Sequence, residues 1–276
     1  MDPRLLIPAG LLGLLFGLLA GRARARRQPV VHCEFWVYVP KAVLPKQDAV
    51  VDAMMRGQGR AGTLAGPIGP AEGLLLSHVG THVGLVLRSK NPSAFRPDLA
   101  HGVEGLGSEE LEALNEAEAL IRVVFVARKP PAKREHLSFT PAMALGYLAV
   151  AEGTLVYDVA ANAVYLPESF RGAMDRPAKQ ASSHVVVRWR FRPQGWMAST
   201  SGMGKMGLPE LEFGPAESDH EALATELVRE AAEALWKSGS LTRSLTVAAF
   251  NDEYALRLGE PRRGIVSLNV ESRSAS

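Results

Sequence analysis

The sequence of 276 residues contains a single cysteine, and its charges nearly cancel. One thiol excludes an internal disulfide framework and a zinc site built from several cysteines. With 31 Lys and Arg against 29 Asp and Glu, the net charge is +2. Proteins that bind nucleic acid usually carry a basic patch or stripe, and these totals leave no excess to build one. We therefore expect no nucleic-acid partner.

Complete catalytic and cofactor motifs are also missing. The sequence holds no G-x-S-x-G, which excludes the nucleophile elbow of the hydrolases that use it. The dipeptide Gly204-Lys205 invites a phosphate-loop interpretation, but that loop requires Gly at position 199 and Ser or Thr at position 206. Those positions hold Ser199 and Met206. We expect no cofactor, and catalysis is the less favoured interpretation.

One long uncharged run is present, at Leu5–Ala20, and reads LLIPAGLLGLLFGLLA. As a helix rising about 1.5 Å per residue it spans roughly 24 Å, somewhat less than a hydrocarbon core of about 30 Å. Arg4 and Arg22 can snorkel at its ends and extend this reach. We interpret Leu5–Ala20 as a single transmembrane helix that binds the lipid bilayer. A cleaved signal peptide is the alternative interpretation.

The flanks of this run predict its orientation. Four arginines follow it within seven residues, whereas one arginine and the terminal amine precede it. The positive-inside rule places the arginine-rich side in the cytoplasm. Residues 1–29 are thus predicted to form an anchor with a basic flank. Residues 30–276, with a net charge of −2, are predicted to form a cytoplasmic domain at the inner membrane.

The hydrophobic pattern of this body predicts an α+β fold. Strands are expected at 32–39 and 122–127, a hairpin around Gly80 at 74–87, and helices at 47–56 and from Ser108 onward. The order β-α-β-β-α-β is that of a ferredoxin-like half. On the strand at 32–39, Cys33, Phe35 and Val37 are expected on one face.

A second, mixed α+β half is predicted to pack against the first. Residues 158–183 are expected to be irregular. The longest helix is predicted at 218–237, begun by a capping box of Ser218 and Glu221 and ended at Gly239. The other expected elements are a helix from Thr140 to about Ala151 and strands at 154–157, 184–191, 196–201, 210–213, 246–250 and 265–270.

The glycine-rich stretch Ser199–Gly207 and the carboxylates that follow it form the main candidate site. Its backbone can form an anion-binding nest, although we favour a tight connection whose glycines permit positive φ. Glu210 and Glu212 project from one face of a predicted strand, as acid–base or metal chemistry requires. We favour a solvated outer face, with Leu211 turned into the core. The candidate ligand-binding residues are Thr200, Ser201, Gly202, Gly204, Lys205, Glu210 and Glu212.

His78 and His82 are weaker candidates, as metal ligands. They face each other only if the hairpin loop is Val79–Thr81; with a loop of Gly80–Thr81 they lie on opposite faces. Even the first register supplies two ligands, whereas zinc sites have three or four. We expect no metal site.

The candidate segment also carries a family resemblance. Thr200-Ser201-Gly202-Met203, then Gly207, then Glu210-Leu211-Glu212 follow the pattern T-x-G-M/L, a nearby glycine, and E-x-E. In this the chain resembles a bacterial family, domain-of-unknown-function family four-two-six-one. The resemblance covers about residues 75–270. It implies an α+β fold and no established catalysis, and it transfers no catalytic residue.

Taken together, the sequence predicts a membrane-tethered binding or scaffolding domain with a protein partner. The alternative is a hydrolase or transferase with its site near Ser199–Lys205 and Glu210/Glu212.

The uncharged run and its arginine flank lead to a direct prediction. The full-length protein should sediment with membranes and stay with them in alkaline carbonate, because a transmembrane helix resists extraction. Immunoblotting of pellet and supernatant measures this, with a peripheral membrane protein as the control that is released. Release of the full-length protein into the supernatant would contradict the anchor.

Overall fold

The computed structural model describes residues 31–57, 80–96, 103, 106–174 and 180–275. The predicted anchor Leu5–Ala20, the first strand of the predicted hairpin and His78 lie outside these residues. No helix within the described ranges is long and apolar enough to cross a membrane. The described chain is a mixed α+β structure with two sheets and five α-helices.

The first sheet is antiparallel throughout and has the strand order β2-β3-β1-β4-β5. As predicted, Cys33, Phe35 and Val37 share one face of β1, and all three are 0% exposed. β1 is the central strand of the five, and it pairs with β3 along its whole length and with β4 on its other side. The strands are β1 (Val31–Val39), β2 (Thr81–Leu87), β3 (Ala119–Ala127), β4 (Leu155–Asp158) and β5 (Ala163–Tyr165).

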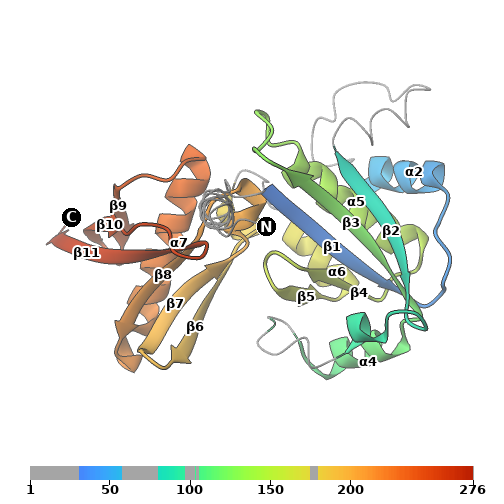
Figure 1. Cartoon of the computed structure of the whole chain (residues 1–276), viewed down its shortest axis with the longest axis horizontal. Helices are drawn as coiled ribbons and strands as arrows, with labels where there is room; N and C mark the ends of the chain where they lie inside the picture. The colour runs from blue at the N-terminus through green and yellow to red at the C-terminus, as the bar shows by residue number, and fades with distance from the viewer. Residues whose placement is uncertain (1–30, 58–79, 97–102, 104–105, 175–179, 276) are drawn as a thin grey trace, which may run out of the picture.

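Helices cover both faces of this sheet (Figure 1). On one face α2 (Gln47–Gly57), α5 (His136–Val150) and α6 (Pro167–Met174) pack against the row that contains Phe35. On the other face α4 (Ser108–Glu116) and the 3₁₀ turn η2 (Pro92–Phe95) pack against the row that contains Tyr38. The helix predicted at 47–56 is confirmed by α2, which ends one residue later.

The ferredoxin-like arrangement predicted for 32–127 disagrees with this sheet in two respects. The helices of that plait share one face, whereas α2 and α4 lie on opposite faces. The sheet is also completed by β4 and β5, which come from beyond residue 127. The hydrophobic pattern of the sequence predicted the α-helices and strands that are described within residues 32–127. It does not determine which strands pair with β1 on either side.

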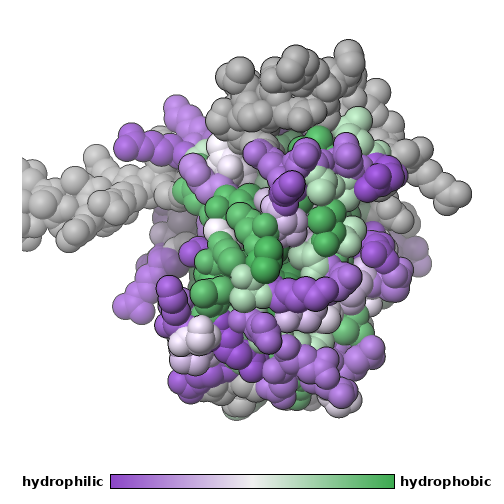
Figure 2. Space-filling view, turned by 90° about the vertical axis from the view of Figure 1, so that its right-hand side faces the viewer, coloured by the Kyte–Doolittle hydropathy of each residue, from purple (hydrophilic) through white to green (hydrophobic). Residues whose placement is uncertain are grey.

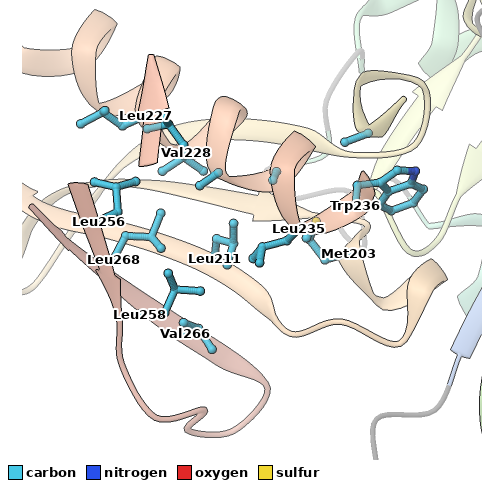
Figure 3. Packing of buried hydrophobic residues seen from close by; sticks show 14 of the residues in the cluster. Met203, Leu211, Leu227, Val228, Leu235, Trp236, Leu256, Leu258, Val266 and Leu268 are labelled. Atoms are coloured by element: carbon cyan, nitrogen blue, oxygen red, sulfur yellow. The ribbon is translucent and has the colours of Figure 1, made fainter. Parts of the chain in front are cut away.

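The second sheet has the order β6-β7-β8-β11-β10-β9 and is antiparallel except between β8 and β11. α7 (Glu221–Ser238) lies across one face of it. Figure 3 shows Leu227, Val228 and Leu235 of this helix above Leu211 and Leu268 of the sheet. The strands are β6 (Val186–Arg192), β7 (Gly195–Ser201), β8 (Glu210–Ala216), β9 (Ser244–Ala249), β10 (Asp252–Leu258) and β11 (Ile265–Ala275).

Several local predictions for the second half are corrected. The described part of 158–183 is not irregular, since it contains β5, α6 and the 3₁₀ turn η4 (Ala181–Ser183). Ser218 begins a 3₁₀ turn, η6 (Ser218–His220), and no side-chain cap bond is made at the start of α7. The predicted stop at Gly239 is confirmed: its φ is +70° and its N–H donates to the carbonyl of Leu235 over 2.8 Å.

Exposed apolar side chains gather at the end of the molecule that carries α2 and the loop before it. Figure 2 looks onto this end and shows hydrophobic residues in its middle, ringed by hydrophilic ones. The most exposed apolar residues of that loop and helix are Val43 (67%), Leu44 (43%) and Met55 (41%).

Candidate functional site

The predicted site segment folds back on itself between β7 and β8. The 3₁₀ turn η5 (Met203–Met206) lies between two glycines with positive φ, Gly202 at +119° and Gly207 at +69°. A Cβ on Gly202 would lie 2.3 Å from the carbonyl oxygen of His184. Glycine is thus required at 202 both by its backbone angle and by the close approach of β6's leading segment.

The segment is a tight connection with glycines at positive φ, the interpretation that we favoured, and its backbone N–H groups also surround an anion, the carboxylate of the chain's own Glu210. The carboxylate of Glu210 accepts hydrogen bonds from the Thr200 hydroxyl at 2.7 Å, from the Gly202 N–H at 3.0 Å and from the Gly204 N–H at 3.4 Å. The Met203 N–H also lies 3.4 Å from it. Successive backbone N–H groups around one carboxylate are what an anion-binding nest offers to an anion.

The remaining contacts of this strand confirm its predicted facing and correct its predicted solvation. Leu211 is 0% exposed, opposite Glu210 and Glu212. Its N–H donates to the Thr200 hydroxyl over 2.8 Å, and Thr200 is itself buried. The side chain of Glu212 is 17% exposed and lies 3.3 Å from Arg192. The two glutamates share a face, but that face is largely covered, because η5 closes over Glu210.

Lys205 is the second residue of the segment that turns inward. Its side chain is 0% exposed and its ammonium pairs with the buried carboxylate of Asp158 on β4. The same ammonium donates to the carbonyl of His184 over 3.0 Å and lies 5.3 Å from the centre of the Phe35 ring. We call this group, Lys205 with Asp158 and the His184 carbonyl, the lock, because it joins η5 of the second sheet to β4 of the first.

Two titratable neighbours of the lock, Cys33 and His136, are neutral. Burial raises the pKa of the Cys33 thiol to about 12, so the thiol stays protonated. Burial lowers the pKa of His136, whose neutral ring donates from Nε2 to the Lys205 carbonyl over 2.8 Å and stacks on Phe125. The Lys205–Asp158 pair is not alone in this interior, because Arg188 is also buried and donates to the carbonyls of Ala161 and Asn162 over 2.9 and 2.7 Å.

Ser201 and His82 are not part of the lock, and Gly204 contributes its N–H to the Glu210 nest. Ser201 ends β7 and pairs with Val186, and Gly204 has open space where a Cβ would stand. His82 is exposed on β2. Within the described ranges, the side chains that gather in metal-ligand geometry are Glu217, Asp219 and His220, all of them exposed, as acidic surface groups often are without an ion.

A pocket of about 450 Å³ lies next to the lock, between α6, η4 and the start of β6. The two are connected through His184, which binds Lys205 through its carbonyl and stacks its ring on Trp236 at 5.4 Å. The sequence analysis missed this pocket because it predicted 158–183 to be irregular. The two serines before His184 were a polar feature of that stretch that could have indicated a site. The described lining residues are Tyr165, Ser169, Gly172, Ala173, Ser182, Ser183, His184, Val185 and Val186.

Comparison with known proteins adds no relative. No protein-family model matches the chain, and searches of curated proteins and of solved structures return no match.

The Glu210 nest predicts an asymmetric response of the two glutamates. Glu210→Ala should lower the free energy of unfolding by about 3 kcal/mol or more, because it leaves several buried donors without an acceptor. Glu212→Ala is the matched control and should cost about 1 kcal/mol or less, since its partner Arg192 is partly exposed. Urea unfolding of the full chain in detergent compares the two variants. Equal losses would contradict the nest.

Proposed function

We propose that the chain is a binding domain tethered to the inner membrane through Leu5–Ala20, with its body in the cytoplasm. Its ligand site is the pocket between α6, η4 and β6. The observation that carries this proposal is the position of the pocket: one wall belongs to the first sheet's α6, another leads into β6 of the second. A ligand bound there contacts both halves of the molecule at their junction.

The lining indicates the chemistry of the ligand. The described lining is polar and uncharged: it contains Ser169, Ser182, Ser183 and Tyr165, and no Asp, Glu, Lys or Arg. Its volume of about 450 Å³ falls in the usual range for small-molecule sites. These features suit an uncharged polar molecule, such as a sugar, a nucleoside or an amide.

The hydrolase or transferase alternative at Ser199–Lys205 and Glu210/Glu212 has less support. An acid, base or nucleophile must reach its substrate, and the Lys205 side chain is 0% exposed. The carboxylate of Glu210 is engaged by the nest. Lys205 and Glu210 are engaged in hydrogen bonds and an ion pair within the chain. We therefore assign the ligand site to the pocket and not to this segment.

A protein partner remains part of the proposal. The apolar area at the end of the molecule that carries α2 supports it (Figure 2), since an exposed apolar patch often marks an interaction site.

Gly172 offers a way to close the pocket without disturbing the fold. It lines the pocket, and a Cβ added there meets no atom within 4 Å. Gly172→Phe should abolish ligand binding while unfolding stability stays the same or rises by up to about 1 kcal/mol, because glycine is a poor helix former. A thermal-shift screen of the full chain in detergent with neutral sugars, nucleosides and amides identifies the ligand, and calorimetry then measures its affinity for the variant.

The control is Gly84→Phe on β2, where a Cβ also meets nothing within 4 Å and which lies outside the pocket lining. It should bind like the unaltered chain. Undiminished binding by Gly172→Phe, or a screen without a single stabilising compound, would overturn this assignment.

A further inference from the structure

The outermost strand of the second sheet has one free edge. β9 pairs with β10 along all six of its residues and is the last strand in the sheet order. Figure 1 shows it at the end of the molecule opposite β2. Its other side therefore presents backbone N–H and C=O groups that no described strand takes up.

This edge lacks the protection that edge strands usually carry. β9 reads Ser-Leu-Thr-Val-Ala-Ala and contains no charged residue. By contrast β6, the strand at the opposite edge of the same sheet, carries Arg188, Arg190 and Arg192 among its seven residues. Charged side chains on an edge strand hinder pairing with another chain. β9 has none, so no charge on the strand opposes such pairing.

The hydrogen-bond pattern fixes which groups of β9 face outward. The N–H of Leu258 donates to the carbonyl of Arg243 over 2.9 Å, so this pair is a hydrogen-bonded one. Because bonded and non-bonded pairs alternate in an antiparallel ladder, Leu245 and Val247 bond inward to β10. The backbone groups of Ser244, Thr246 and Ala248 therefore point to the free edge.

We propose that β9 of a second copy of this chain pairs antiparallel with this edge, with Thr246 opposite Thr246 of that copy. This register bonds all three outward-facing residues, because Ser244 then stands opposite Ala248 of the other chain. A register shifted by two residues leaves one of the three outside the ladder. The twofold axis runs perpendicular to the sheets, which continue into each other across the contact.

The side chains of β9 are complementary to themselves in this register. On the outer face, small polar or small apolar residues meet each other, with a Thr–Thr pair at the centre. On the inner face Leu245 stands opposite Val247 of the second copy. Val247 is 5% exposed and Leu245 is partly buried in the apolar layer beneath α7, so the contact extends that layer across the two chains.

Two exposed apolar residues flank β9 and support a second copy as its partner. Leu241 is 38% exposed just before the strand and Phe250 is 61% exposed just after it. In the antiparallel register, Phe250 of each chain lies beside the Leu241 segment of the other. The exposed apolar groups at the two ends thus cover one another, and no like charges face each other along the strand.

Cross-linking through Thr246→Cys tests the contact and its register together. The natural Cys33 is 0% exposed, which leaves the new thiol as the accessible one. Directly opposed residues of a bonded pair have Cα atoms about 5.5 Å apart, within the range of a disulfide. Mild oxidation of the full chain in detergent should therefore convert Thr246→Cys to a covalent dimer on a non-reducing gel.

Two matched variants separate this register from random collision. Ser244→Cys and Ala248→Cys should each stay monomeric alone and should cross-link when mixed. Linking of each with itself, or failure of Thr246→Cys to link, would overturn the proposal. Attachment of Thr246→Cys to a different protein in intact membranes, without the homodimer, would also overturn it by showing another strand at this edge.

Charge substitution gives a measurement that does not need oxidation. Thr246→Lys and Thr246→Glu should each sediment as a monomer, because like charges then meet across the axis, and an equal mixture should restore the dimer. A dimer of either variant alone, or an unaltered chain that is monomeric at tens of micromolar, would contradict the contact.

Discussion

The ion pair between Lys205 and Asp158 is a buried charged interaction that joins the two sheets, beside the hydrogen bonds of Arg188 on β6 to the carbonyls of Ala161 and Asn162. Both charges are withdrawn from water, with side-chain exposures of 0% and 2%. Such a pair is sustained only where further hydrogen bonds satisfy both ions. Here the ammonium also binds the His184 carbonyl and faces the Phe35 ring, while Asp158 accepts the Ala161 N–H at 3.1 Å. The elements that supply these groups come from both sheets, so the pair fixes one sheet against the other.

Three residues of the Thr200–Glu212 segment hold the turn that carries Lys205. Gly202 admits the close approach of the His184 carbonyl, and Glu210 holds the N–H groups of the turn around its carboxylate. Thr200 connects that carboxylate to the backbone of Leu211. These contacts are made within the chain, and the segment adjoins the pocket, because His184 accepts a hydrogen bond from Lys205 and also lines the pocket.

The sequence was most informative where a pattern is local. Period-two alternation predicted the buried face of β1 and the inward Leu211, and glycine chemistry predicted the end of α7. The sequence did not predict contacts between residues that are far apart in the chain. Spacing placed Glu210 and Glu212 on one face but did not reveal the turn that covers Glu210. The partner of Lys205 is 47 positions away in a stretch predicted to be irregular. The pocket was missed for the same reason, since its walls come from segments with weak patterns.

A double-mutant cycle on the lock tests its role most directly. Lys205→Met, Asp158→Asn and the double variant are compared by urea unfolding of the full chain in detergent. Each single change should lower the free energy of unfolding by about 3–5 kcal/mol, because it leaves a buried charge without its partner. The double change should cost less than the sum of the two by about 2 kcal/mol or more. Losses that simply add would contradict the claim that this pair joins the two sheets.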